Sequence, residues 1–317
     1  MPNDIGVVPR SLQTDVTTAA LAGLTATPKT LPSMLFYDDE GCRLFYEITN
    51  LPEYYLTRTE TALLRSIAAT VVPEGFRDAV LVEFGGSDET KARILLDQPG
   101  SPFNTYVSID VAAPALSVVR GRLKESHPDL TVVTIVADFM QPVDLQALGS
   151  PRLGFFPGST IGNLDPDNAT HFLHTARFSL GQGAWFLLGA DLRKSPKLLL
   201  PAYNDAAGVT AAFNLNLLRR LNREAGADFD LSCYRHEARW NDQESRIEMH
   251  LISTRDQAVH LGQSWILLQE GESIHTENSY KHTPEAITAI ARRAGWETHK
   301  VWQDAAGLFG IFLFRGD

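Results

Sequence analysis

Short apolar runs that alternate with helix-like segments are the feature that most constrains the fold of this chain. The first run, Ala79–Phe84, precedes the turn Gly85-Gly86-Ser87 and a helical stretch, Lys91–Leu96. Further runs, with helical material between them, lie at Thr105–Ile109, Thr131–Val136, Leu153–Phe156 and Ala184–Leu188. Strands in alternation with helices form parallel sheets that carry helices on both faces. The pattern therefore predicts an α/β fold.

Segments outside these runs predict a second group of elements. Thr57-Arg58-Thr59-Glu60 has the form of a capping box, so a helix is expected to start there. One helix is expected over Tyr203–Glu224, and Ser245–Ser253 and Ser264–Gln269 are expected to be a pair of strands. Thr283-Pro284-Glu285 has the cap and first-turn proline of a helix start. Two strand-like runs close the chain, Thr298–Trp302 and Leu308–Phe314.

Charge and composition exclude several classes of protein. Lys and Arg number 28 and Asp and Glu number 38, which gives 28 − 38 = −10, so nucleic acid is not an expected partner. Met1–Thr17 lacks the pattern of a signal peptide, and no stretch approaches the roughly 20 apolar residues that span a bilayer. Two distant cysteines and nine histidines without a His-x-x-x-His pattern predict no metal site. We therefore expect a cytoplasmic protein with no membrane partner.

Three strand ends carry residues suited to a nucleoside. Gly85 follows the first strand, where a glycine turn lets the backbone approach a ligand closely. Asp110 ends the second strand and could accept hydrogen bonds from ribose hydroxyls, although a turn or helix-cap aspartate remains an alternative. Asp138-Phe139 follows the third strand, where a carboxylate and a ring suit adenine. Without a G-x-G-x-x-G motif, the set favours an adenosine ligand that lacks a pyrophosphate, such as S-adenosylmethionine.

Longer sequence blocks carry a family resemblance. They are LTATPKTLP (24–32), LPEYYLTRTE (51–60), GSTIGNL (158–164), YNDAAGVTAAFN (203–214), ADFDL (227–231) and RIEM (246–249). In these blocks the chain resembles the bacterial histidine-specific Nα-methyltransferases of ergothioneine biosynthesis. The resemblance implies a monomer that transfers methyl groups from S-adenosylmethionine to the α-amine of L-histidine. Three successive transfers would give the trimethyl betaine, hercynine.

The resemblance also implies the domain plan and the site. It implies a Rossmann-like, seven-stranded class I methyltransferase domain over residues 62–196 and 284–317, and a substrate-binding domain over residues 1–61 and 197–283. The implied cofactor contacts are Gly85, Lys91, Asp110, Asp138 and Phe139. The implied histidine pocket comprises Tyr37, Tyr54, Gly158, Asn163, Tyr203, Met249, Glu277 and Ser279, with Tyr37 and Asn163 at the reacting amine.

The residue chemistry agrees with an imidazole substrate. If the segment is extended, Glu277 and Ser279 project to the same side, where a carboxylate and a hydroxyl can meet the two ring nitrogens. Asn163 and the tyrosines are neutral, so they would hold an amine without favouring its ammonium form. A solvated strand end for Glu277 and a left-handed turn for Asn163 are the alternatives.

One departure keeps other functions open. Family members usually have glycine, any residue and then a small residue after the first strand, whereas this chain has Gly85-Gly86-Ser87. A protein that binds S-adenosylmethionine without turnover is therefore an alternative. A second alternative is an N-methyltransferase of a related aromatic amino acid such as tryptophan.

Overall fold

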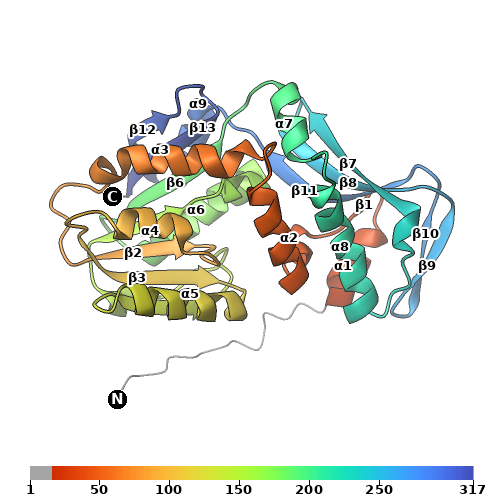
Figure 1. Cartoon of the computed structure of the whole chain (residues 1–317), viewed down its shortest axis with the longest axis horizontal. Helices are drawn as coiled ribbons and strands as arrows, with labels where there is room; N and C mark the ends of the chain where they lie inside the picture. Colours follow the sequence, from red (N-terminus) through yellow and green to blue (C-terminus); the bar gives the residue numbers. More distant parts are fainter. Residues whose placement is uncertain (1–15, 317) are drawn as a thin grey trace, which may run out of the picture. The chain divides into compact units, whose positions relative to one another are not determined.

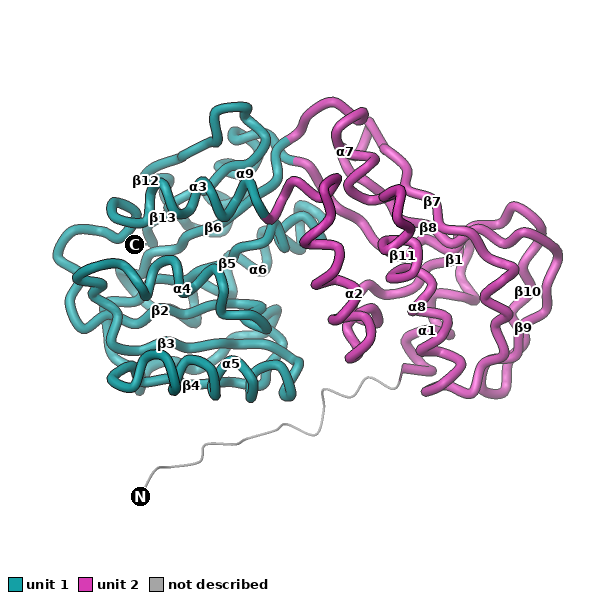
Figure 2. The backbone as a smooth tube through the Cα atoms, viewed as in Figure 1, with its two compact units in different colours: residues 1–12, 58–192, 282–317 teal, residues 13–57, 193–281 magenta. Residues whose placement is uncertain are grey.

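The computed structural model describes residues 16–316. The expectation of no signal peptide falls almost entirely on residues 1–15, which lie outside this range. The described chain forms two compact units, the first from residues 58–192 and 282–316 and the second from residues 16–57 and 193–281 (Figure 2). None of the described helices combines the length and apolar character needed to cross a bilayer.

The first unit is built on a seven-stranded sheet with the order β12-β13-β6-β5-β2-β3-β4 (Figure 1). Its strands are β2 (Ala79–Phe84), β3 (Phe103–Asp110), β4 (Thr131–Val136), β5 (Arg152–Phe156), β6 (Trp185–Asp191), β12 (Trp296–Gln303) and β13 (Phe309–Gly316). Strands β2 to β6 pair in parallel, and β13 runs antiparallel to both β6 and β12. The expected seven-stranded α/β sheet is confirmed.

Helices cover both faces of this sheet because its strands are apolar on both sides. Leu81 packs in one core with α3 (Tyr55–Val71), α4 (Thr90–Leu96) and α5 (Ala113–Ser126). Val80 and Val82 point the other way, into a core with α6 (Pro166–Leu180) and α9 (Pro284–Arg293). The loops at the strand ends contain the short helices η2 (Gln146–Leu148) and η3 (Thr160–Asn163). Because strands β2 to β6 are parallel, their carboxyl ends lie at one edge of the sheet.

The second unit contains a four-stranded sheet with the order β1-β11-β8-β7 and a separate hairpin of β9 and β10. The strands are β1 (Lys29–Thr30), β7 (Tyr234–Asn241), β8 (Arg246–Ser253), β9 (Gln257–Leu261), β10 (Ser264–Leu268) and β11 (Ser273–Tyr280). Its helices are α1 (Val16–Leu24), η1 (Ser33–Phe36), α2 (Asp39–Thr49), α7 (Pro196–Ala202), α8 (Val209–Glu224) and η4 (Leu231–Cys233).

A buried amide joins α8 to this sheet. Asn214 donates to the His236 ring on β7 at 2.9 Å and to the His250 carbonyl on β8 at 3.1 Å. Its own oxygen accepts from the Thr276 hydroxyl on β11 at 2.8 Å. One fully buried side chain thus bonds to three strands, which fixes α8 over one face of the sheet.

Three expectations about local structure are wrong. Helix α3 begins at Tyr55, so Thr57 and Glu60 lie inside the helix and do not form a capping box. Helix α8 begins only at Val209, because the Asp205 carboxylate accepts from the Val209 and Thr210 amides and so caps the helix at that point. The strands expected as a pair, β8 and β10, belong to different sheets: β8 lies between β7 and β11, and β10 pairs with β9.

Candidate functional site

The turn after β2 exposes backbone that only glycine permits. Gly85 has a φ of +75°, in the left-handed region that disfavours side chains. A Cβ atom on Gly86 would lie 2.2 Å from the Ser108 hydroxyl, which donates to the Gly86 carbonyl at 2.6 Å. Ser87, the residue that departs from the family pattern, is solvent-exposed. The turn therefore leaves open backbone at the end of β2.

Asp110 and Asp138 lie at the ends of the next two strands. The Asp110 carboxylate accepts from the Ala112 amide at 2.8 Å, and burial raises its pKa above the ordinary value. Asp138 follows β4 and accepts from the Met140 amide at 2.9 Å. Each carboxylate is thus fixed by a backbone amide at the same sheet edge as the glycine turn.

Phe139 joins this edge to the core. Its ring centroid lies 5.6 Å from that of Phe156 and 5.4 Å from that of Phe172. The ring also lies beside Gly85, since a Cβ built there would be 3.7 Å from it. Phe139 and Gly85 therefore lie side by side, and the Phe139 ring packs against the rings of Phe156 and Phe172.

A buried carboxylate holds the loop after β5. Glu60 on α3 accepts from the Gly158 amide at 2.8 and 3.0 Å and pairs with the Lys91 ammonium at 2.5 Å. Gly189 on β6 makes room for it, because a Cβ there would lie 2.3 Å from a Glu60 oxygen. Two of the expected site residues, Lys91 and Gly158, are thus joined through Glu60, which sequence reasoning assigned to a helix cap.

The same loop carries Asn163 at the end of η3. The left-handed conformations of this loop belong to Gly158, with a φ of +82°, and Ser159, with a φ of +58°. The Ser159 hydroxyl accepts from the Asp191 amide on β6 at 2.9 Å. Asn163 is therefore not the left-handed turn residue considered as an alternative, and its side chain is partly exposed.

In the second unit, the polar side chains of Tyr203, Ser279 and Lys281 lie together at the end of β11. The Lys281 ammonium donates to the Tyr203 hydroxyl at 2.7 Å and to the Ser279 hydroxyl at 2.8 Å. The two hydroxyl oxygens are 2.9 Å apart. Tyr54 packs its ring edge-on against that of Tyr203, with centroids 6.2 Å apart. Three of the expected pocket residues, Tyr54, Tyr203 and Ser279, are thereby brought together around a lysine.

A β-bulge aims Glu277 at this group. His275 pairs with His250 on β8, but Glu277 pairs with Met249, so Thr276 is the extra residue. The Thr276 hydroxyl, which donates to Asn214, also lies 3.0 Å from the Met249 carbonyl, and the His275 ring donates to the Glu277 carbonyl at 3.0 Å. Neighbouring strand residues alternate between faces, so the bulge moves Glu277 from the face of His250 to that of Met249 and Ser279.

The Glu277 carboxyl is in an unusual environment. Burial raises its pKa to about 7, and the positive charge of Lys281 works against that rise. Within residues 16–316, no group donates a hydrogen bond to this carboxyl. The side chain is partly exposed, so a carboxylate that lies beside a hydroxyl and faces no internal donor is accessible to an external N–H group.

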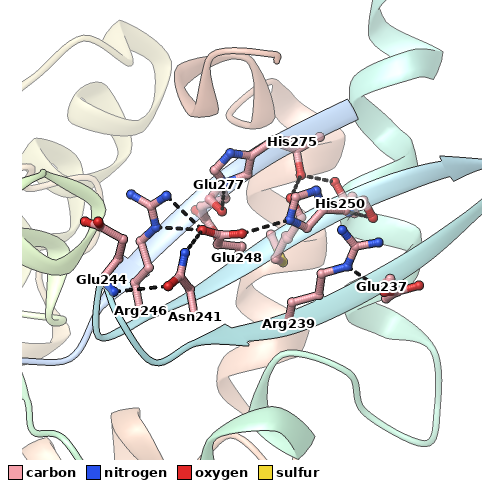
Figure 3. A network of polar contacts seen from close by, with 12 residues as sticks. Glu237, Arg239, Asn241, Glu244, Arg246, Glu248, His250, His275 and Glu277 are labelled. Carbon is pink, nitrogen blue, oxygen red and sulfur yellow. Dashed lines mark hydrogen bonds and ion pairs between the residues drawn. The ribbon is translucent and has the colours of Figure 1, made fainter. Parts of the chain in front are cut away.

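The opposite face of the same sheet carries a different network (Figure 3). The Glu248 carboxylate accepts from Asn241 at 2.9 Å and from Arg246 at 2.8 Å, and approaches the His250 ring at 3.2 Å. Burial favours a higher pKa, but these donors hold the pKa of Glu248 at about 2. The rings of His250 and His275 stack at 4.8 Å.

Glu248, His250 and His275 are residue types that bind metals, and their ligand atoms lie within 4.8 Å of one another. However, Arg246 already neutralises the carboxylate, and Asn241 occupies the same oxygen. A dication would have to compete with that guanidinium. The ion pair of Arg246 and Glu248 therefore joins β8 to Asn241 on β7, and the stacked histidine rings link β8 to β11.

The remaining expected site residue, Tyr37, lies in another group of rings. Its ring meets Phe45 at 6.1 Å and Phe213 at 6.2 Å. Sequence reasoning missed Glu60 and Lys281. For Lys281 a signal was present, because Glu277, Ser279 and Lys281 recur at every second position along one strand face.

Comparisons with known proteins agree on one family. Residues 16–316 match the family described as histidine-specific methyltransferase, SAM-dependent. The histidine N-alpha-methyltransferase of Mycolicibacterium smegmatis is 41% identical over 296 residues, which cover 92% of each chain. That of Mycobacterium tuberculosis is 40% identical, with the same coverage. A 4-dimethylallyltryptophan N-methyltransferase from Penicillium roqueforti is 28% identical and matches over 89% of this chain and 88% of its own length.

A solved structure shows the same fold at low sequence identity. The mitomycin 7-O-methyltransferase MmcR superposes with a TM-score of 0.50 at 12% identity, covering 90% of this chain and 60% of that one. The likeness extends to the fold alone.

Proposed function

The chain belongs to the family of S-adenosylmethionine-dependent, histidine-specific methyltransferases, and from this premise we propose that it methylates the α-amine of L-histidine. The main support for histidine as the substrate is the Glu277 carboxyl, whose pKa is raised and which shares a strand face with the Ser279 hydroxyl. A carboxylate and a hydroxyl in this arrangement can accept from one imidazole nitrogen and donate to the other.

S-adenosylmethionine is the methyl donor, and the first unit fits it. The open turn at Gly85, the fixed carboxylate of Asp110 and the Asp138-Phe139 pair lie at one sheet edge. We propose that Asp110 accepts from the ribose hydroxyls, that Asp138 accepts from the adenine amine, and that Phe139 packs on the base. When bound, the donor supplies a methyl carbon already activated by a positive sulfur, so the protein contributes mainly orientation.

For the amino-acid end of the substrate, we propose contacts from neutral groups. Asn163 and Gly158 in the first unit, and Tyr37, Tyr54 and Tyr203 in the second, are the candidates. Neutral contacts let the amine lose its proton, which it must do before it can attack the methyl carbon. Aromatic faces such as that of Tyr54 also suit a product that becomes a quaternary ammonium. Tyr37 and Asn163 are the proposed contacts of the reacting nitrogen.

The same proposal includes the division of labour between the units. Residues 62–196 with 284–317 would bind the donor, and residues 1–61 with 197–283 would recognise the substrate. Three successive transfers would give hercynine, and the enzyme would act as a monomer in the cytoplasm. Gel filtration combined with light scattering tests the oligomeric state.

Mass spectrometry of the reaction tests the function directly. The full chain is incubated with S-adenosylmethionine and, separately, with histidine, tryptophan, phenylalanine and tyrosine. We expect histidine alone to gain one, two and finally three methyl groups. Methylation of tryptophan in place of histidine would instead support the indole alternative. Tight donor binding by calorimetry without any product would support a binding protein that does not turn over.

A further inference from the structure

Lys281 is the most deeply buried cation of the second unit's site. The residue follows β11 directly and has a relative exposure of 1%. Its ammonium lies over the Tyr203 ring, 4.7 Å from the ring centroid. Its ammonium donates to the hydroxyls of Ser279 and Tyr203, and it forms no ion pair with Glu277 within hydrogen-bonding distance. A buried ammonium directed at two hydroxyls makes each of them an acceptor of one hydrogen bond.

The donor count limits the contact between the two hydroxyls to two arrangements, in which either Tyr203 or Ser279 is the donor. An ammonium has donors only, so the Ser279 and Tyr203 oxygens both accept from Lys281. The 2.9 Å contact between the two oxygens then uses one hydroxyl proton. When Tyr203 donates this bond, Ser279 accepts from both neighbours, and its own proton points away from them.

We infer that Lys281 is a positioning residue for substrate recognition: it donates to both Ser279 and Tyr203, Tyr203 donates the bond between the two hydroxyls, and the Ser279 proton is thereby left to donate toward the ligand. This inference depends on the proposed function. With Glu277 as acceptor and Ser279 as donor, the pair is complementary to a neutral imidazole, which has one N–H and one bare nitrogen. An imidazolium ring has two N–H groups and an indole has no bare nitrogen, so neither satisfies Ser279.

The inference also explains a need for Tyr203 beyond packing. The Tyr203 hydroxyl accepts a hydrogen bond from Lys281, and in the inferred arrangement it donates its own proton to Ser279. Without the lysine, both hydroxyls could rotate, and Ser279 could accept as readily as it donates. The pair would then lose its preference for a ring that carries a bare nitrogen.

Lys281→Met tests this role, because methionine fills a similar volume without donors. We expect KM for histidine to rise about 10- to 100-fold, while KM for S-adenosylmethionine stays within about two-fold. The preference for histidine over tryptophan, measured as a ratio of kcat/KM values, should fall by a similar factor. A loss in kcat with an unchanged KM for histidine and unchanged preference would overturn the inference.

Lys194→Met is the matched control. Lys194 donates to the Tyr55 hydroxyl at 2.8 Å and lies 4.8 Å from that ring, so the same contact is removed elsewhere in the second unit. Its KM for histidine should change less than about two-fold. A rise equal to that of Lys281→Met would show a general effect of removing a lysine–tyrosine contact and would overturn the inference.

A double-mutant cycle separates action through Ser279 from other effects. In a Ser279→Ala background, Lys281→Met should raise KM for histidine by less than about three-fold, because its target hydroxyl is gone. Independent, multiplicative effects would contradict the inference. If Lys281→Met does not fold, Lys281→Arg must bind histidine more tightly than Lys281→Gln, and equal affinities would overturn it. A wild-type enzyme that does not methylate histidine would instead reject the proposed function.

Discussion

Each unit places a lysine and a glutamate near one another, with one of the two side chains buried, but the hydrogen bonds of the two pairs differ. In the first unit, Lys91 pairs directly with Glu60, whose oxygens also accept from the Gly158 amide. In the second, Lys281 bonds to two hydroxyls, and the Glu277 carboxyl receives no hydrogen bond from the described residues. The first carboxylate is thus committed to the protein, whereas the second is held ready for a ligand.

The difference shows what makes a buried charge functional. A buried ion pair whose hydrogen bonds are all internal joins segments of the chain, as Glu60 joins α3 to the loop after β5. A buried carboxylate without internal donors is costly to the fold and persists where a ligand supplies the missing donor. Glu60 is buried and Glu277 is partly exposed, and their hydrogen-bond partners separate the two roles.

The largest expected effect comes from breaking the pair in the first unit. Glu60→Ala leaves the Lys91 ammonium without its carboxylate and the Gly158 amide without its acceptor, so the free energy of unfolding should fall by about 3–5 kcal/mol. Urea unfolding followed by circular dichroism measures this. Glu40→Ala, which removes an exposed carboxylate from its pair with Arg43, should leave the midpoint nearly unchanged. Equal midpoints for both variants would remove the structural role of Glu60.

The next effect belongs to the second unit and to binding. Glu277→Gln replaces a charge-assisted hydrogen bond by a neutral one, so KM for histidine should rise about 10- to 100-fold, equivalent to roughly 1.5–3 kcal/mol. KM for S-adenosylmethionine should not change. Initial-rate kinetics with each substrate varied in turn provide the measurement. Glu237→Gln, which removes a carboxylate on β7, a strand separated from β11 by β8, is the control and should retain wild-type KM.

A smaller effect follows from pH. Burial raises the pKa of Glu277 to about 7, so its carboxylate forms as pH rises through that value. The imidazole of free histidine becomes neutral at about 6.5. The titration of Glu277 should therefore lower KM for histidine by about ten-fold between pH 6 and pH 8, and the titration of the imidazole should lower it by about a further four-fold. In Glu277→Gln only the imidazole titrates, so its KM should level off at a lower pH. Identical profiles in both proteins would mean that Glu277 does not accept from the ring.

The sequence predicted the first unit better than the second, for physical reasons. The parallel strands are continuous apolar runs, and their ends at Gly85, Asp110 and Asp138 follow from local pattern alone. Strand β7 reads YRHEARWN, whose polar face carries the Glu248 network, so apolar content did not mark it. The seven-stranded sheet was thus predictable, but this strand was not.

Side-chain roles that depend on distant partners were the least predictable. Glu60 looked like a helix-capping residue because its local spacing fits one, whereas its actual partners, Lys91 and Gly158, lie 31 and 98 residues away. Lys281 acquires its role from Tyr203, 78 residues earlier. The bulge at Thr276 depends on the pairing of β11 with β8 and has no mark of its own in the sequence.

The smallest expected effect is on the pH dependence of stability, and it has opposite signs for Glu277 and Glu248, which lie in the same sheet. The pKa of Glu277 is raised from 4.5 to about 7, so the folded state binds the proton more tightly than the unfolded state. The contribution of Glu277 to wild-type stability should therefore fall as pH rises from 4.5 to about 7 and stay level above it. Glu277→Gln removes this loss, and its unfolding temperature at pH 8 should exceed that of wild type by about 1–3 °C.

Glu248 is the matched control, because its pKa is lowered from 4.5 to about 2. Its contribution to stability is present above pH 4.5 and lost as pH falls toward 2, so Glu248→Gln should unfold at a lower temperature than wild type at pH 8. Differential scanning calorimetry of both variants at pH 5 and pH 8 makes the comparison. A Glu277→Gln variant that is less stable than wild type at pH 8 would mean that this carboxylate is already satisfied inside the protein, as Glu60 is. The distinction between Glu60 and Glu277 would then fail.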